Sequence, residues 1–313
     1  MSGATNTVGV VGGGRWGLAL SCAARRAGRD VVLYSRRGHV EADAHAVEVT
    51  TDLGEVARRA TLILVAVPSE VVRDVARQLG DHVDGSHLIA HGIRGLSGEG
   101  LTPISDVIRA ETPCRRVGAL GGPAIADDLI EGRPGVIAVG SRYREVTRAV
   151  ADALWSGSLR VSESDDLVGL EWASALSGGL FVAIGYARAI GVGPALLAGL
   201  LTRGVHEAAR IAAAAGADER TFFLLPGIGD VMAAMGNDDR PECRLGAALA
   251  RGKTLDEARA EARLRVEAPE LIPRVVAFAR AKRLDARVFT VMDAVLRGEL
   301  DPSGVIERLM RRD

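Results

Sequence analysis

The chain has 313 residues, enough for about two domains, and 48% of its residues are apolar, so each domain can bury a core. Its formal net charge of −1 leaves no basic excess to bind a nucleic-acid backbone or an anionic membrane. Three cysteines stand far apart, which predicts neither a disulfide framework nor a metal site. The polar start and the short apolar runs predict no signal peptide and no membrane insertion, so we expect a cytoplasmic protein.

Short apolar runs alternate with helix-like stretches in the first half of the chain. The expected strands span residues 7–11, 31–34, 61–67, 87–90, 117–120 and 135–139. Strands that alternate with helices predict a mostly parallel sheet covered on both faces. We therefore expect a doubly wound α/β domain of the Rossmann type over residues 1–164.

Helix-like segments dominate the sequence after about residue 166. The expected helices span residues 167–187, 194–215, 243–250, 254–263, 269–282 and 288–297. Glycine and proline separate them, and no β-branched run typical of a strand stands among them. Residues 165–313 are therefore predicted to form an all-α domain that binds substrate or supports dimerisation.

A glycine-rich turn follows the first strand directly and opens a helix. Residues 12–17 read Gly-Gly-Gly-Arg-Trp-Gly, which fits G-x-G-x-x-G. Gly12 permits the tight turn, Gly14 lets a pyrophosphate approach the backbone, and Gly17 lets the helix pack closely on the strand. This context predicts a dinucleotide site that includes Arg15 and Trp16; a structural turn without a ligand is the alternative.

The end of the second strand bears on which dinucleotide binds. An NAD site favours Asp or Glu there, to accept a hydrogen bond from the ribose 2′-hydroxyl. This chain has Ser35, Arg36 and Arg37 instead. Guanidinium groups suit a 2′-phosphate, so NADP(H) is favoured and NAD(H) stays open. An ordinary solvated pair of arginines is the alternative interpretation.

Later segments of the chain resemble bacterial NAD(P)-dependent glycerol-3-phosphate dehydrogenases. The similar blocks are Val67-Pro68-Ser69, residues 121–129 (GGPAIADDL), Gly169-Leu170-Glu171, residues 202–207 (TRGVHE), residues 227–230 (GIGD) and Val266-Glu267-Ala268. They follow the family's order at compatible spacing over nearly the whole chain. The resemblance implies reduction of dihydroxyacetone phosphate to sn-glycerol 3-phosphate, or the reverse reaction, with the nicotinamide carrying the hydride.

The resemblance also implies site residues, and two of the family's lysines are missing. The family's catalytic lysine, a general acid/base on the substrate oxygen, is Ser177 here, and the lysine that helps bind substrate is His91. Neither Lys253 nor Lys282, the only lysines of the chain, lies near either position. The family's S-R-N block reads Arg240-Pro241-Glu242, and Asp230 has lost its expected lysine partner.

Candidate roles follow for the residues in these positions. Ser177, Asp230 and His91 are the catalytic candidates, because imidazole titrates near neutral pH and can act as an acid or bind phosphate. A structural or solvated histidine and an aspartate that caps a helix are the alternatives for His91 and Asp230.

Further residues are assigned to the ligands. The substrate is expected near His91, Gly122 and Arg240, with Arg94 as a further cation for phosphate. Ala126 and Glu267 line the nicotinamide by family match.

The predicted function is an NAD(P)H-dependent oxidoreductase that acts on a CH–OH group of a small molecule and uses no metal; a phosphorylated substrate stays open. The lost lysines leave two alternatives open. One is an NADPH-binding paralogue with a changed carbonyl or imine substrate that needs less acid assistance, and the other is a non-catalytic dinucleotide sensor. A homodimer through the helical domain is a further expectation.

Overall fold

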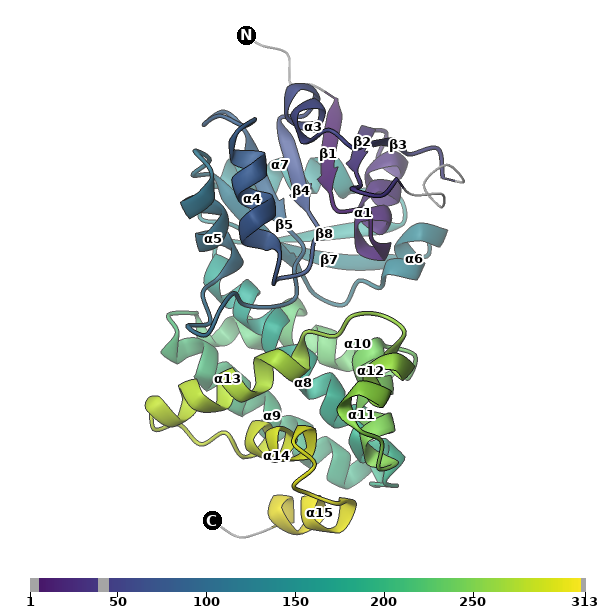
Figure 1. Ribbon diagram of the computed structural model, residues 1–313, viewed down its shortest axis with the longest axis vertical. Helices are drawn as coiled ribbons and strands as arrows, with labels where there is room; N and C mark the ends of the chain where they lie inside the picture. The colour runs from purple at the N-terminus through teal and green to yellow at the C-terminus, as the bar shows by residue number, and fades with distance from the viewer. Residues whose placement is uncertain (1–5, 39–44, 311–313) are drawn as a thin grey trace. The chain divides into compact units, whose positions relative to one another are not determined.

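The computed structural model describes residues 6–38 and 45–310, except the side chains of residues 309 and 310. The chain forms two compact units (Figure 1). The sheet unit consists of Met1–Ile93 and Thr102–Glu171, and the helical unit of Arg94–Leu101 and Trp172–Asp313. A short segment between two strands of the sheet unit therefore belongs to the helical unit.

The sheet unit is built on eight strands among the described residues. They are β1 (Thr7–Val11), β2 (Asp30–Tyr34), β3 (Glu48–Thr50), β4 (Leu62–Val65), β5 (Leu88–His91), β6 (Val117–Gly121), β7 (Gly135–Gly140) and β8 (Leu159–Ser164). Their order across the sheet is β3-β2-β1-β4-β5-β6-β7-β8. Only β6 and β7 pair antiparallel. The strand order reverses between β1 and β4, where open α/β sheets bind ligands.

Helices cover both faces of this sheet (Figure 1). They are α1 (Arg15–Arg26), α3 (Leu53–Arg59), α4 (Val72–Gly80), α5 (Ile104–Glu111), α6 (Ala126–Glu131) and α7 (Arg144–Leu154). Successive side chains of a strand point to opposite faces. Leu62 and Leu64 of β4 pack with α1, α6 and α7, whereas Ile63 and Val65 pack with α3, α4 and α5. The buried apolar strands thus support two cores, as the sequence predicts.

All six predicted strands are present, but two further strands were not predicted. β3 has three residues and is half-buried, so it is too short to show a period. β8, at the sheet edge, alternates buried Leu159 and Val161 with exposed Arg160 and Ser162, because only one face of this strand packs against the core. The expected third strand ends at Val65 rather than Val67.

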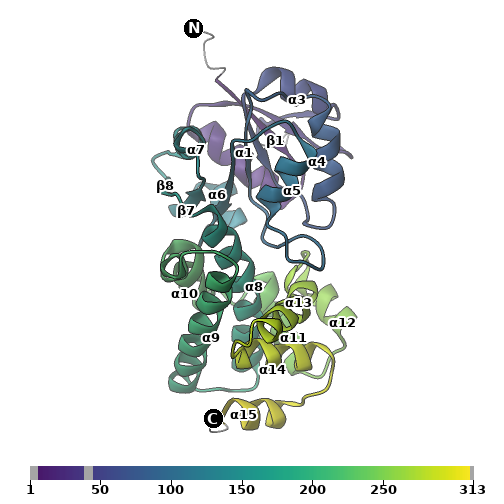
Figure 2. The ribbon, with the colours of Figure 1, turned by 90° about the vertical axis from the view of Figure 1, so that its left-hand side faces the viewer.

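The helical unit contains the six predicted helices and several shorter elements (Figure 2). Its elements are α8 (Leu167–Ala189, whose first residues lie in the sheet unit), α9 (Pro194–Ala214), the 3₁₀ helix η1 (Glu219–Phe223), the π-helix η2 (Leu225–Gly229), α10 (Asp230–Met235), α11 (Pro241–Ala250), α12 (Leu255–Ala262), α13 (Ala268–Ala281), α14 (Arg287–Leu296) and α15 (Pro302–Met310). α8 and α9 pack closely, since a methyl group added at Gly204 would lie 2.7 Å from Leu180 Cδ2. The fold class is the predicted one, a Rossmann-type α/β part followed by an all-α part.

Helix α8 corrects the expectation that every apolar run is too short to span a membrane. Its 23 residues are long and apolar enough by length and composition. However, 89% of its most apolar window is buried inside the protein, as in the core helix of a folded domain. A helix surrounded by other helices is apolar on all sides, which explains its composition.

Two glycines allow α8 and α11 to approach each other closely, and one of them provides a stability test. A methyl group at Gly246 would lie 2.0 Å from the carbonyl oxygen of Val182, and one at Gly185 would lie 1.9 Å from that of Cys243. We predict that Gly246→Ala lowers the free energy of unfolding by about 1–3 kcal/mol, because backbone atoms must separate. Urea unfolding at equilibrium measures it.

Gly199→Ala is the matched control for this prediction. Gly199 lies on an exposed face of α9, and no atom lies within 4 Å of an added methyl group. Alanine should therefore raise the free energy of unfolding there by about 0.5–1 kcal/mol, through helix propensity alone. Equal effects of the two substitutions would contradict the close packing of α8 on α11.

Candidate functional site

The glycine-rich turn after β1 adopts the backbone that its sequence predicts. Gly12 has φ +126°, a conformation that favours glycine, and an added Cβ there would lie 2.3 Å from the carbonyl oxygen of Ala66. A Cβ at Gly17 would lie 1.8 Å from the carbonyl oxygen of Gly12. These two glycines are therefore required by the packing of α1 on β1 and β4.

Gly14 differs from the other two glycines. It is exposed, and a Cβ added there would meet no atom within 4 Å. It is also the N-cap residue of α1, where no side chain caps the helix and no acidic residue stands in the first turn. The first N–H groups of α1 and the positive end of its dipole are thus available to an anion. A pyrophosphate fits this open, uncapped helix start.

Arg15 and Trp16, which lie between these glycines, are placed by neighbouring segments of the sheet unit. Arg15 forms an ion pair of 2.7 Å with Asp127 of α6. The indole of Trp16 lies against Gly92, where an added Cβ would be 2.4 Å from Nε1. Trp16 Nε1 is buried and has no hydrogen-bond partner within the described part of the chain. The indole therefore links the glycine-rich turn to the segment after β5.

The segment after β2 carries the residues predicted to select the dinucleotide. Ser35 is buried, and a Cβ at Gly13 would lie 2.3 Å from its Oγ. The hydroxyl thus lies beside the glycine-rich turn. Arg36 and Arg37 are exposed, and no ion pair to another described residue holds either guanidinium. Both remain available to a ligand.

Two further predicted residues lie where β6 leads into α6. Gly122 is buried and has φ +99°, which favours glycine at this turn. Ala126 is the first residue of α6 and packs partly buried against the core. Their assignments to substrate and nicotinamide stay predictions.

His91 ends β5 and is almost completely buried, with 1% of its surface exposed. Its Nε2 lies 3.0 Å from Oε1 of Glu171, and its Nδ1 accepts a hydrogen bond of 3.4 Å from the backbone N–H of Ile93. Glu171 also accepts from the backbone N–H of Ser105 at 2.8 Å and from the Ser105 hydroxyl at 2.7 Å. Both ring nitrogens are thus engaged inside the sheet unit. This arrangement favours the structural alternative for His91.

A second polar cluster lies in the helical unit around Asp230, the first residue of α10. Its carboxylate is fully buried. Arg94 Nη1 donates to Oδ2 at 2.7 Å, and Arg240 Nη2 lies 2.9 Å from Oδ1. We call Arg94, Asp230 and Arg240 the arginine–aspartate cluster. The cluster brings the sequence candidates Asp230 and Arg240, which are close in the sequence, together with Arg94, which is 136 positions from Asp230.

The surroundings of this cluster are aromatic and tightly built. The guanidinium carbons of Arg94 and Arg240 lie 5.2 and 4.7 Å from the ring centroid of Phe181, within the range of cation–π contacts. Arg94 Nη1 also donates to the carbonyl oxygen of Ser174 at 3.2 Å. Ser177 is fully buried, and its hydroxyl donates to the carbonyl oxygen of Pro226 at 3.4 Å. The lysine position is therefore occupied by a small, internally bonded side chain.

The charges of the cluster are not fully satisfied by hydrogen bonds. Arg240 Nη2 and Asp230 Oδ1 are close but not aligned for a hydrogen bond, and Arg240 Nε also lacks a partner among the described residues. Burial disfavours the charged form of Arg94, but the carboxylates of Asp230 and Glu242 outweigh it, so its pKa is raised. Arg94 therefore stays charged and cannot release a proton at neutral pH.

Sequence reasoning missed several residues of these clusters. The sequence places Glu171 in a block shared with the family without indicating its partners, and it gives no signal for Ser105 or Phe181. A glutamate within a long apolar helix, as Glu171 is in α8, is a usable signal, because a charge rarely enters a core without partners. Glu267, by contrast, was predicted and lies at the N-cap of α13, 3.7 Å from Arg265; its role stays a prediction.

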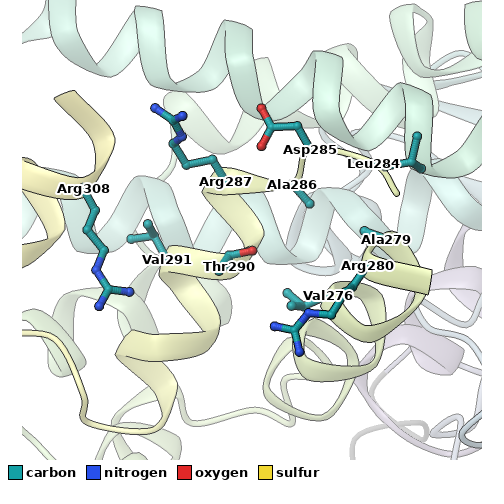
Figure 3. Close-up of a pocket in the computed structure, with 10 residues that line it drawn as sticks. All are labelled: Val276, Ala279, Arg280, Leu284, Asp285, Ala286, Arg287, Thr290, Val291 and Arg308. Carbon is teal, nitrogen blue, oxygen red and sulfur yellow. The ribbon is translucent and has the colours of Figure 1, made fainter. Parts of the chain in front are cut away.

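The predicted residues lie outside a wide cavity in the helical unit. This cavity of about 500 Å³ is lined by residues of α13, α14, α15 and the loop between α13 and α14, with Arg280, Arg287 and Arg308 along its walls (Figure 3). Within the described residues, no group of three or more His, Cys, Asp or Glu side chains could hold a metal ion.

Two family models match consecutive parts of the chain. The model described as NAD-dependent glycerol-3-phosphate dehydrogenase N-terminus matches residues 39–147, and the corresponding C-terminus model matches residues 166–307. A glycerol-3-phosphate dehydrogenase [NAD(P)+] of Rhodospirillum rubrum is 31% identical, over 97% of this chain and 92% of its own length. One from Rhodopseudomonas palustris is 31% identical over 99% and 98%. The chain belongs to the NAD-dependent glycerol-3-phosphate dehydrogenase family.

Solved structures agree on the fold. The glycerol-3-phosphate dehydrogenase of Coxiella burnetii has a TM-score of 0.89 at 23% identity, covering 98% of this chain and 99% of that one. That of Saccharomyces cerevisiae has a TM-score of 0.84 at 16% identity, over 97% and 99%. The predicted family, its Rossmann fold and its class of NAD(P)-dependent oxidoreductases acting on CH–OH groups are confirmed, whereas the individual site residues stay predictions.

The contact between His91 and Glu171 generates a prediction about stability. Removal of Glu171 leaves His91 Nε2 and two donors of Ser105 buried without their acceptor. We expect Glu171→Ala to lower the free energy of unfolding by about 3–5 kcal/mol, as for other broken buried pairs. Urea unfolding of the single variants and of His91→Ala/Glu171→Ala measures their coupling, which should be about 1–3 kcal/mol. Strictly additive effects would contradict the pairing of these two residues.

Proposed function

We propose that the protein is an NADPH-dependent oxidoreductase that reduces a small phosphorylated ketone, with dihydroxyacetone phosphate as the substrate and sn-glycerol 3-phosphate as the product. The observation that carries this proposal is the open, uncapped start of α1 at Gly14, after a turn that only glycine fits at Gly12. Membership of the dehydrogenase family supports the same reaction.

A bound nicotinamide would supply the hydride that joins the carbonyl carbon of the substrate. The residues that would hold this cofactor are Gly12, Gly14 and Gly17 at the pyrophosphate and Arg36 and Arg37 at the adenosine ribose. The two arginines are exposed and unpaired among the described residues, which supports a 2′-phosphate and hence NADPH.

The arginine–aspartate cluster would bind the anionic part of the substrate. Arg240 Nε and Nη2 are buried and make no hydrogen bond among the described residues, so a phosphate or an oxyanion that enters the cluster would find two donors there. Ser177 has no charge and uses its hydroxyl internally, so we assign it no proton transfer. The proton that neutralises the alkoxide product then comes from water.

A second function is favoured by one specific observation. The family's catalytic lysine position is a buried serine, and general acid/base help is worth about 10²–10⁴-fold in rate. An NADPH-binding paralogue with a changed carbonyl or imine substrate, or a dinucleotide sensor without turnover, would tolerate this loss. Both share the dinucleotide site with the first function, but neither would oxidise NADPH in the presence of dihydroxyacetone phosphate.

Turnover separates these functions. The purified protein is titrated with NADPH and NADH by fluorescence, and dihydroxyacetone phosphate is then added while nicotinamide absorbance is followed. Substrate-dependent oxidation supports the dehydrogenase, and binding without oxidation favours the second function. Gly14→Val should weaken NADPH binding at least about tenfold, because it fills the approach to the pyrophosphate. Gly157→Val, at an exposed site with open space, is the control and should leave binding unchanged.

The two arginines after β2 generate a prediction about cofactor choice. We expect Arg36→Ser/Arg37→Ser to raise the Kd for NADPH at least about tenfold, since charged hydrogen bonds to a phosphate are worth about 1.5–3 kcal/mol each. The Kd for NADH should change less than about threefold, because NADH lacks the 2′-phosphate. Arg25→Ser, an exposed arginine at the end of α1, is the control. Equal weakening of both cofactors would contradict a 2′-phosphate site.

A further inference from the structure

The carboxylate of Asp230 needs positive charge because it is fully buried. Two elements supply it, the segment 94–101 through Arg94 and the start of α11 through Arg240. α8 contributes no cation here: Ser174 offers its carbonyl oxygen to Arg94, and Ser177 bonds to Pro226. Thus the charge opposite Asp230 comes from outside the helix on which the family resemblance places the catalytic lysine.

The path of the Arg94 side chain along α8 explains how its guanidinium reaches Asp230. A Cβ added at Gly178 would lie 3.5 Å from Arg94 Cδ, so the aliphatic part of the arginine runs against the α8 turn that carries Ser177. Its guanidinium then stacks near Phe181 and ends at Asp230. The side chain occupies the side of α8 that faces the carboxylate, and small residues at 177 and 178 leave room for it.

We propose that Arg94 is a positioning residue that replaces the family's α8 lysine as the cation opposite Asp230, so that the site carries a permanent charge instead of a titratable one. Glu242, 4.0 Å from Arg94 Nε, is the other charged group that faces the cluster. The catalytic consequence rests on the proposed function: the site binds and orients an anionic group at any pH, and donates no proton. The replacement itself does not rest on it.

The proposal predicts how a lysine restored at position 177 behaves. In the natural chain, Ser177→Lys adds a third cation beside Arg94 and Arg240, so the pKa of the new lysine should fall below its value in the unfolded chain. The new lysine then destabilises the folded state increasingly as the pH falls from about 10 to 7. In the Arg94→Gln background, Asp230 has lost Arg94 as a partner and can pair with the new lysine, so the pKa of this lysine should rise. The added stability is then present below about pH 10 and lost above it.

The experiment compares Ser177→Lys with Ser177→Met, a control of similar length without charge, in the natural and the Arg94→Gln backgrounds. Urea unfolding between pH 6 and about 10.5 gives, in each background, the ratio of the unfolding constant of Ser177→Lys to that of Ser177→Met. We expect the pH dependence to have opposite signs in the two backgrounds, with at least a tenfold difference in this ratio at pH 7, which corresponds to one pKa unit. The same sign in both backgrounds would overturn the proposal.

Folding failures are also informative. If Ser177→Lys folds only with Arg94→Gln, the proposal is supported; if it folds in neither background while both methionine controls fold, the proposal is wrong. If the methionine controls do not fold, Arg94→Lys is compared with Arg94→Gln instead. At pH 7 the unfolding constant of Arg94→Lys should be at least tenfold lower than that of Arg94→Gln. This difference should disappear above about pH 10, where the lysine loses its charge. Equal stability of the two variants would overturn the replacement.

Turnover supplies a separate readout that a merely structural role would not move. In the natural chain, no lysine in the site loses a proton at alkaline pH, so kcat/KM should not decrease for that reason. In Arg94→Lys, kcat/KM should decrease at alkaline pH as the new lysine loses its proton. The same alkaline fall in both proteins would contradict the permanent charge. If no substrate is turned over, the proposed function fails while the unfolding experiment still decides the replacement.

Discussion

A buried carboxylate constrains the polar centre of the helical unit. Asp230 has no exposed side-chain surface, and a charge in that position must be paired and hydrogen-bonded or the unit loses stability. Lysine is almost absent from this chain, with only Lys253 and Lys282, so arginine has to supply the charge. Arginine is larger and planar, which accounts for the Phe181 ring under both guanidinium groups and for the small residues beside them.

A second constraint acts in the sheet unit, where the backbone rather than side chains makes the candidate ligand site. Gly12 and Gly17 are held by contacts that a methyl group would break, whereas Gly14 is free of such contacts. Packing explains the first two, whereas packing does not require glycine at position 14, where the open backbone leaves room for a ligand. Glu171 then fixes the end of β5 through His91 and the start of α5 through Ser105. These contacts join the end of β5 to the start of α5.

The sequence predicts the parts of this structure that depend on local patterns. Buried strands such as 7–11 and helices such as 194–215 have strong periods, and the glycine-rich turn has a spacing with a mechanical cause. β3 is too short to show a period, whereas the helix predicted over residues 167–187 is found as α8, two residues longer at its C-terminal end.

Side-chain partnerships could not be read from the sequence in the same way. Arg94 and Asp230 stand 136 positions apart, and His91 and Glu171 stand 80 apart, so only the fold brings them together. The resemblance to the family identified the missing lysine but offered no means to find its replacement. A permanently charged arginine cannot take over the lysine's proton transfer. It can only take over the electrostatic part.

The central claim is that the chain still transfers hydride without the family's lysine, and deuterium transfer tests it most directly. NADPH carrying deuterium at the transferable C4 position is incubated with the protein and dihydroxyacetone phosphate, and the product is analysed by mass spectrometry. We expect glycerol 3-phosphate with one deuterium at C2. If all of the dihydroxyacetone phosphate is recovered unlabelled while NADPH is bound, hydride transfer to this substrate is contradicted.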